Sequence, residues 1–252
     1  MTPKQNWTVS LRHSLAAVLL TLAAGLALAG IAHVKAKWVT LSFSASGNEG
    51  ALDRAVNQEK HSPYAAALAY MLTQPGQELT QVLSQAGNLV EKKTQGKQHP
   101  HFSAPPNTSV VLNPAREMTQ TRRVALLIGN YRYQHFSPLA TPGNDVRLVA
   151  AALKQAGFAH VQVEQNLSLA EMKSALLAFK KITANADVAV IYYAGFGMQS
   201  NNTNYLVPVD LEMDPDKIAT GGLELRQLSI ESIDVAHLVL LIDACFPGTT
   251  AL

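Results

Sequence analysis

Residues 186–199 read ADVAVIYYAGFGMQ, and this stretch decides the fold. An apolar run rich in β-branched residues ends in a glycine-rich turn, which is typical of a strand covered on both faces of a parallel sheet. A second apolar run, 238–242, leads into Asp243 and then Cys245, the one cysteine of the chain. In parallel sheets, sites form at the carboxyl ends of strands. The two runs therefore predict a site that combines the turn at Phe196 with the thiol.

The carboxy-terminal half alternates apolar strand patterns with amphipathic helix patterns. This alternation predicts an α/β fold with a parallel-rich sheet flanked by helices. We expect strands at 124–128, 161–163, 186–193 and 235–242, and helices at 145–156, 169–181 and within 223–235.

The glycine spacing excludes a nucleotide-binding sheet. Gly195 and Gly197 would need a third glycine at Ser200, and no GxxxxGK[ST] motif occurs. The net charge of +2, without a run of Lys and Arg, gives no argument for nucleic acid. His99 and His101 stand without Cys or Asp at ligand spacing. We expect no metal ion and no cofactor.

The first 32 residues predict export. Lys4 and Arg12 precede the uncharged residues 14–32, which contain an Ala-Leu-Ala sequence suited to signal cleavage. A stretch of this length is also about long enough to span a bilayer as a helix. We expect either a cleaved signal peptide or an uncleaved membrane anchor, and a buried core helix is the remaining interpretation. The protein is accordingly expected to be periplasmic, extracellular or membrane-anchored.

The middle of the chain predicts helices and a linker. A short strand is expected at 38–43, and the apolar stripe of the helix at 77–93 predicts packing on the later domain, on a second copy or on a partner. The expected organisation is an export or anchor segment at 1–32, a helical and linker region at 33–120 with helices at 64–73 and 77–93, and the α/β domain at 121–252.

Five segments of the second half carry a family resemblance. They resemble the caspase-like cysteine peptidases of bacteria, the metacaspase-like branch also called orthocaspases, in the part that forms the large catalytic subunit. The resemblance implies a caspase-like sheet and cysteine-type endopeptidase chemistry. The segments are RRVALLIGNYRY (122–133), GNDVRLVAAALKQAGF (143–158), ADVAVIYYAGFGMQ (186–199), NYLVPVD (204–210) and LLIDAC (240–245).

The resemblance implies a role for each matching position. Cys245 matches the nucleophile, and Phe196 lies where the family has the histidine that serves as general acid and base. The backbone N–H groups of Gly197 and Cys245 match the oxyanion hole. Asp145 and Asp243 match acidic residues that line the pocket for an Arg or Lys side chain. An alternative interpretation of Asp145 is a helix N-cap.

The phenylalanine is the first departure from the family pattern. A phenyl ring can neither accept nor donate a proton, and general acid–base help is worth roughly 10²–10⁴-fold in rate. Among the other histidines of the α/β domain, His160 and His237 begin strands and are expected at the far edge of the sheet. His135 follows the first strand of that domain and could serve as a substitute base.

The expected end of the sheet is the second departure. Family members continue after the cysteine with a smaller segment that adds strands and completes the substrate groove, whereas this sequence ends at Leu252. We therefore expect a sheet truncated after the strand that leads to Cys245, with an open edge. A partner chain would cover that edge, or the chain is a truncated product.

Three functions stay open at this point. The first is a caspase-family protein, exported or membrane-tethered, whose peptidase activity is impaired or lost, so that it serves as a scaffold or decoy for basic peptides. The second is an active cysteine endopeptidase that cleaves after Arg or Lys with Cys245 and a substitute base. The third is a fragment without a stable fold. The sequence leaves catalytic activity undecided.

Overall fold

The computed structural model describes residues 38–45, 51–52, 60–115, 121–212, 214–228, 233 and 235–244. The chain divides into two compact units, Met1–Ala36 and Lys37–Leu252, and every described residue belongs to the second. The predicted export segment at 14–32 lies outside the described residues. Within the described ranges, no helix is long and apolar enough to cross a membrane.

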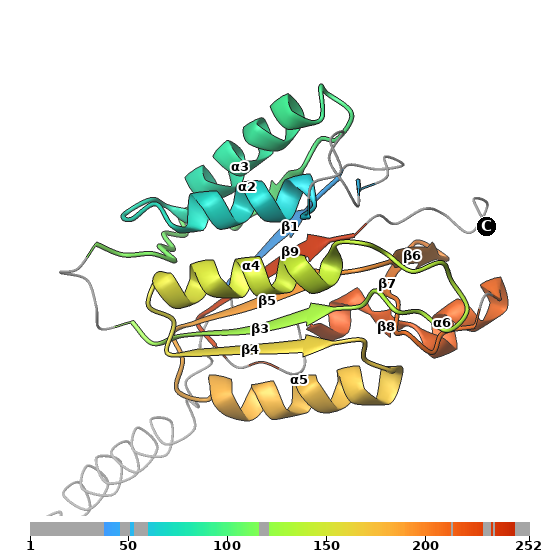
Figure 1. Cartoon of the computed structure of the whole chain (residues 1–252). Coiled ribbons are helices and arrows are strands. Elements are labelled where there is room, and N and C mark those ends of the chain that lie inside the picture. The colour runs from blue at the N-terminus through green and yellow to red at the C-terminus, as the bar shows by residue number, and fades with distance from the viewer. Residues whose placement is uncertain are drawn as a thin grey trace, which may run out of the picture. The chain divides into compact units, whose positions relative to one another are not determined.

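A six-stranded sheet forms the centre of the second unit (Figure 1). Its strands are β1 (Trp38–Phe43), β2 (His101–Ser103), β3 (Arg123–Gly129), β4 (His160–Gln165), β5 (Val188–Ala194) and β9 (His237–Asp243). Their order across the sheet is β2-β1-β9-β5-β3-β4, and only β2 runs antiparallel to its neighbour. The predicted parallel-rich α/β fold is confirmed.

Helices cover both faces of this sheet. On one face lie α2 (Pro63–Leu72), α3 (Leu79–Lys93) and α4 (Pro142–Gln155), and on the other lies α5 (Leu169–Thr183) (Figure 1). Every residue of β3 and β5 is buried. The unbroken apolar runs of these strands follow from the double covering, since neither face meets water.

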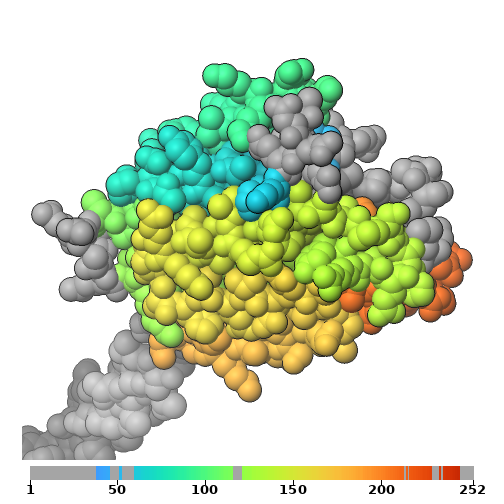
Figure 2. All heavy atoms as spheres, in the orientation of Figure 1, coloured from blue at the N-terminus to red at the C-terminus, as the bar shows by residue number. Residues whose placement is uncertain are grey.

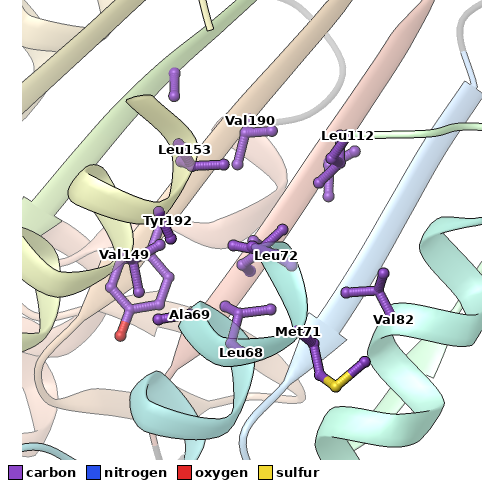
Figure 3. Close-up of a cluster of buried hydrophobic side chains, with 14 of the residues drawn as sticks. Leu68, Ala69, Met71, Leu72, Val82, Leu112, Val149, Leu153, Val190 and Tyr192 are labelled. Atoms are coloured by element: carbon purple, nitrogen blue, oxygen red, sulfur yellow. The ribbon is translucent and has the colours of Figure 1, made fainter. Parts of the chain in front are cut away.

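The helices from the two halves of the sequence share one core. Leu68 and Leu72 of α2 lie beside Val149 and Leu153 of α4, over Val190 of β5 (Figure 3). All five side chains are fully buried, and each contributes about 1.5–3 kcal/mol relative to an exposed position. In the space-filling view α2 and α4 form a continuous surface (Figure 2). The helix at 79–93 buries its apolar stripe in the same cluster, but its main neighbours are α2 and β2 rather than the elements after residue 121 that were expected as one of three alternatives.

The edge of β9 is covered by the same chain, which corrects the expectation of an open, truncated sheet. β1 pairs with β9 in parallel, from Trp38 opposite His237 to Phe43 opposite Ile242, and β2 adds the outer strand. No partner chain is needed at that edge of β9. β1 and β2 thus lie in the same sheet as the later strands, although both fall within residues 33–120, which the sequence predicted to be a separate helical and linker region.

A small second sheet follows β5. It consists of β6 (Gly197–Ser200), β7 (Thr203–Leu206) and β8 (Leu223–Glu224). Asn201 and Asn202 join β6 to β7 with φ values of 50° and 58°, as a two-residue type I′ hairpin turn requires. The sequence predicted only a turn here. Three short helical segments follow in this region, η1 (Pro215–Lys217), α6 (Ile218–Gly221) and η2 (Leu225–Leu228). Of these, η2 lies within residues 223–235, where a helix was expected.

The start of α4 differs from its prediction by three residues. The helix begins at Pro142, a residue favoured in the first turn because it lacks an N–H, and Thr141 is its N-cap residue. Asp145 therefore lies inside the first turn. The alternative interpretation of Asp145 as the N-cap is wrong.

Candidate active site

The carboxyl ends of β3, β5 and β9 meet at one edge of the sheet. The Asn130 N–H donates to the carbonyl of Ala194 across 2.9 Å, and the Gly195 N–H donates to the carbonyl of Asp243 across 3.3 Å. These bonds hold the three strand ends side by side. The edge predicted to carry the site is thus assembled, and Cys245 itself lies outside the described residues, two positions after Asp243.

Asp145 and Asp243 are brought together by one serine. The Ser62 N–H donates to Asp145 Oδ1 across 3.1 Å, and the Ser62 hydroxyl donates to Asp243 Oδ2 across 2.6 Å. The two carboxylates are 1% and 7% exposed. Because a buried carboxylate is costly without hydrogen bonds, the donors from Ser62 make this arrangement tenable. The two sequence-predicted acids therefore form a single pair, which we call the acidic pair.

Two further side chains contact the acidic pair. The Nδ1 of His61 lies 3.2 Å from Asp145 Oδ1, and the Tyr192 hydroxyl donates to Asp243 Oδ2 across 3.1 Å. Burial first, and then the charges of Asp243 and Asp145, raise the pKa of Tyr192 well above its ordinary value. Its hydroxyl thus stays a hydrogen-bond donor across the neutral range.

Sequence reasoning missed Ser62 and His61 as site residues. A serine followed by Pro63 does signal a helix start, and the Ser62 hydroxyl indeed caps α2 by accepting from the Ala65 N–H. That signal is local. It gives no indication that the same hydroxyl reaches a carboxylate 181 residues away.

Phe196 is held in an aromatic cluster. Its ring centroid lies 4.8 Å from that of Tyr133 and 5.8 Å from that of Phe136. Its N–H donates to the Tyr133 hydroxyl, and its carbonyl accepts from the Tyr193 hydroxyl, both across 2.8 Å. The position that the family resemblance assigns to histidine therefore holds an apolar ring with apolar neighbours, and its backbone is fixed by two tyrosines.

Gly197 presents its N–H away from β7. The Val207 N–H donates to the Phe196 carbonyl across 3.0 Å, which makes those two residues a hydrogen-bonded pair of the hairpin. Hydrogen-bonded and non-hydrogen-bonded pairs alternate along antiparallel strands, so Gly197 and Leu206 form a non-hydrogen-bonded pair. This orientation is compatible with the oxyanion-hole role that the resemblance implies.

The three histidines of the α/β domain do not all lie at the same edge of the sheet. His160 and His237 begin β4 and β9, so both lie at the amino ends of the strands, as predicted. Six residues of strand, or about 20 Å, separate His237 from Asp243. His135 is exposed in the loop after β3, next to Phe136 of the aromatic cluster. Of these three histidines, only His135 lies beside the cluster around Phe196.

Metal ligation finds no support in the described ranges. No three His, Cys, Asp or Glu side chains among them are placed to share an ion. The ring of His101, one of the two histidines considered from the sequence, stacks on Phe43 with centroids 5.0 Å apart. This stacking is a packing contact between β2 and β1.

The fold and the polar strand ends define a caspase-type α/β sheet. The chain matches the caspase-domain family of peptidases (C14) over residues 30–111 and 122–251, which is well over half of its length. It therefore belongs to the caspase-domain family. The first matched segment contains β1 and β2, and the second contains β3 to β9. In this chain the strands beyond β9 are thus supplied by residues that precede the rest of the domain.

Two curated relatives are similar over a shorter stretch. Mucosa-associated lymphoid tissue lymphoma translocation protein 1 of Homo sapiens is 34% identical over 88 residues, which is 35% of this chain and 11% of the relative. Its homolog in Mus musculus is 34% identical over 88 residues, covering 35% of this chain and 10% of the relative. The alignments thus span about a tenth of each relative's length.

Proposed function

We propose that this caspase-family protein binds a basic side chain of a peptide at the acidic pair and that its cysteine peptidase activity is impaired. The single observation that carries the second part is the apolar cluster around Phe196, at the position of the family's histidine. The first part is supported by Asp145 and Asp243, which are drawn together at the carboxyl edge of the sheet.

The impairment follows from the two proton transfers that the reaction requires. In the family's reaction a cysteine thiolate, here from Cys245, attacks the peptide carbonyl, and the departing amine must gain a proton. A free cysteine is only a few per cent thiolate at neutral pH, and the phenyl ring of Phe196 neither takes the thiol proton nor supplies one to the amine. The loss of this help costs roughly 10²–10⁴-fold in rate. Oxyanion donors such as the Gly197 N–H would still stabilise a bound carbonyl.

The test is cleavage of fluorogenic peptides that end in Arg or Lys before the reporter group. We expect the purified full chain to show no turnover that depends on Cys245, as judged against Cys245→Ala. Phe196→His should gain cysteine-dependent turnover, while Phe136→His, which places the same imidazole elsewhere in the cluster, should not. Cysteine-dependent turnover by the wild type at family-like rates would disprove the impairment.

An active endopeptidase with a substitute base is the alternative function. His135 favours it, because this histidine neighbours Phe136, whose ring contacts Phe196. If the wild type does cleave the peptides, His135→Ala should abolish cleavage and His99→Ala should leave it unchanged. Equal activity of the two variants would remove His135 from consideration.

We also propose that the protein is exported or held at a membrane through residues 14–32. The support is the pattern of the sequence, with basic residues ahead of an uncharged stretch. Expression of the full chain with a carboxy-terminal tag, followed by fractionation and amino-terminal sequencing, distinguishes a cleaved signal from an anchor. Recovery of the uncleaved protein from the soluble cytoplasmic fraction alone would contradict both.

A further inference from the structure

The acidic pair already has ligands from its own chain. Asp145 Oδ1 accepts from the Ser62 N–H and lies 3.2 Å from His61 Nδ1, while Asp243 Oδ2 accepts from the hydroxyls of Ser62 and Tyr192. A peptide side chain that enters this site must share the two carboxylates with these groups or replace one of them. The structure distinguishes which of them can leave.

Ser62 and Tyr192 are fixed in place. Tyr192 is fully buried in the sheet, and Ser62 is 3% exposed and caps α2 through its bond to the Ala65 N–H. Moving Ser62 would pull α2, with the buried Leu68 and Leu72, out of the core. Burial of these leucines stabilises the packing of α2, so these donors stay with the protein when a ligand binds.

His61 is the group that can leave. It lies two residues before Pro63, the first residue of α2, and its side chain is 32% exposed, whereas Asp145 behind it is 1% exposed. Rotation of the ring toward solvent breaks the contact with Asp145 without moving the helix. A ligand arriving from solvent therefore meets His61 before it meets the buried carboxylate.

Replacement of His61 at Asp145 favours a ligand side chain that is always positively charged. The ring of His61 offers Asp145 one N–H donor and is charged only when protonated. A guanidinium is always charged and presents several donors in a planar fork that fits carboxylates, while an ammonium is a point charge. We infer that His61 is an internal competitor at the acidic pair: it occupies Asp145 until the basic side chain of a ligand displaces it, and it lowers the affinity for every such ligand by the same factor. This inference rests on the proposed function.

Binding measurements on the full chain test this role. The probe is acetyl-glycyl-arginine amide, titrated calorimetrically into protein carrying Cys245→Ala so that no turnover interferes, with the lysine analogue for comparison. His61→Ala should tighten binding of the arginine probe and of the lysine analogue by the same factor, roughly 3- to 10-fold, the worth of one net hydrogen bond. His61→Lys, which ties a permanent cation to the same place, should weaken binding below the wild type. His99→Ala is the matched control and should bind as the wild type does.

The outcomes separate this inference from the proposed function. If the arginine probe binds and Asp145→Asn removes binding, but His61→Ala binds equally or more weakly, then His61 is not a competitor and the inference is overturned while the acidic pair remains the binding site. If neither the wild type nor His61→Ala binds the probe, while thermal unfolding shows both to be folded, the proposed peptide-binding function fails, and the inference with it.

Discussion

The hydroxyl of Ser62 and the carboxylate of Asp243 lie 2.6 Å apart although 181 residues separate them in the sequence. Ser62 is the N-cap residue of α2 in the first matched segment, and Asp243 ends β9 in the second. The same serine thus caps a helix, fixes one carboxylate through its hydroxyl and fixes Asp145 through its N–H. A single side chain couples the packing of the two segments to the geometry of the site.

Ser62→Ala should destabilise the fold by about 2–4 kcal/mol, because the helix loses its cap and a buried carboxylate loses a donor. Urea unfolding followed by circular dichroism measures this change. Ser168→Ala is the matched control: Ser168 caps α5 in a capping box with Glu171 but reaches no carboxylate outside that helix. It should cost about 1 kcal/mol. Equal losses in the two variants would show that the bond to Asp243 contributes nothing.

Gly195→Ala should destabilise the turn that carries Phe196. A Cβ at this position would lie 2.7 Å from the hydroxyl oxygens of both Tyr133 and Tyr193, and these hydroxyls bind the backbone of Phe196. Both tyrosines are buried, so neither can withdraw cheaply. We expect a lowered melting temperature by calorimetry.

Gly87→Ala is the contrasting substitution for Gly195→Ala. Gly87 lies within α3, and a Cβ there would meet its nearest neighbour, Pro100, at 3.9 Å, an ordinary contact. Alanine is favoured over glycine in a helix by about 1 kcal/mol, so this variant should melt at a higher temperature than the wild type. If Gly195→Ala were as stable as Gly87→Ala, the packing of the turn against the tyrosines would be refuted.

The buried tyrosines predict an alkaline limit of stability. Burial is the largest cause that raises the pKa of four of the seven tyrosines above the ordinary value of 10.0, namely Tyr64, Tyr133, Tyr192 and Tyr193. A raised pKa in the folded state means that unfolding releases protons above pH 10. The free energy of unfolding should therefore be unaffected by these groups below pH 10 and fall as the pH rises further.

Absorbance at 295 nm measures this directly during an alkaline titration. The signal of four tyrosines should appear late and together with the loss of the circular dichroism signal. Tyr192→Phe should remove one of the four from the late phase. A single reversible step near pH 10 in a chain that stays folded would contradict the burial of these hydroxyls.

The sequence predicted those parts of the fold that carry local patterns. The strand at 188–194 and the helix at 169–183 were recognisable because both faces of the strand are apolar and the helix has a period of 3.6 residues. The edge with Asp243 and Phe196 followed from strand direction alone. The aromatic neighbours of Phe196 did not, because Tyr133 and Phe136 reach it from a loop without regular periodicity.

Local sequence patterns do not predict which strand pairs with β9. β1 was predicted as a strand, but nothing within its six residues indicates which strand it pairs with nearly two hundred residues later. The resemblance to the family predicts the additional strands after Cys245, whereas in this chain they are β1 and β2, which precede β3. For the same reason His61 and Ser62 were overlooked, since their partners are set by the pairing of β1 with β9 and by the packing of α2 on α4.

The order of the two segments in the sequence should matter little to the folded structure. The first segment contacts β9 through β1 by strand pairing, and it contacts α4 through α2 by apolar packing. A rearranged chain in which residues 121–252 precede residues 33–115 keeps all of these contacts. The join must run back along one strand, about 20 Å, and the thirteen residues 245–252 and 33–37 span up to about 45 Å when extended.

We expect the rearranged chain to melt within a few degrees of residues 33–252 in the original order, and to bind the arginine probe equally in the Cys245→Ala background. Residues 121–252 alone are the control. Without β1 and α2 they expose the edge of β9 and the apolar face that includes Val239 and Leu241, so they should show no cooperative thermal transition. A stable fragment, or a rearranged chain that fails to fold, would show that β1 and β2 do not complete the sheet in the way the structure indicates.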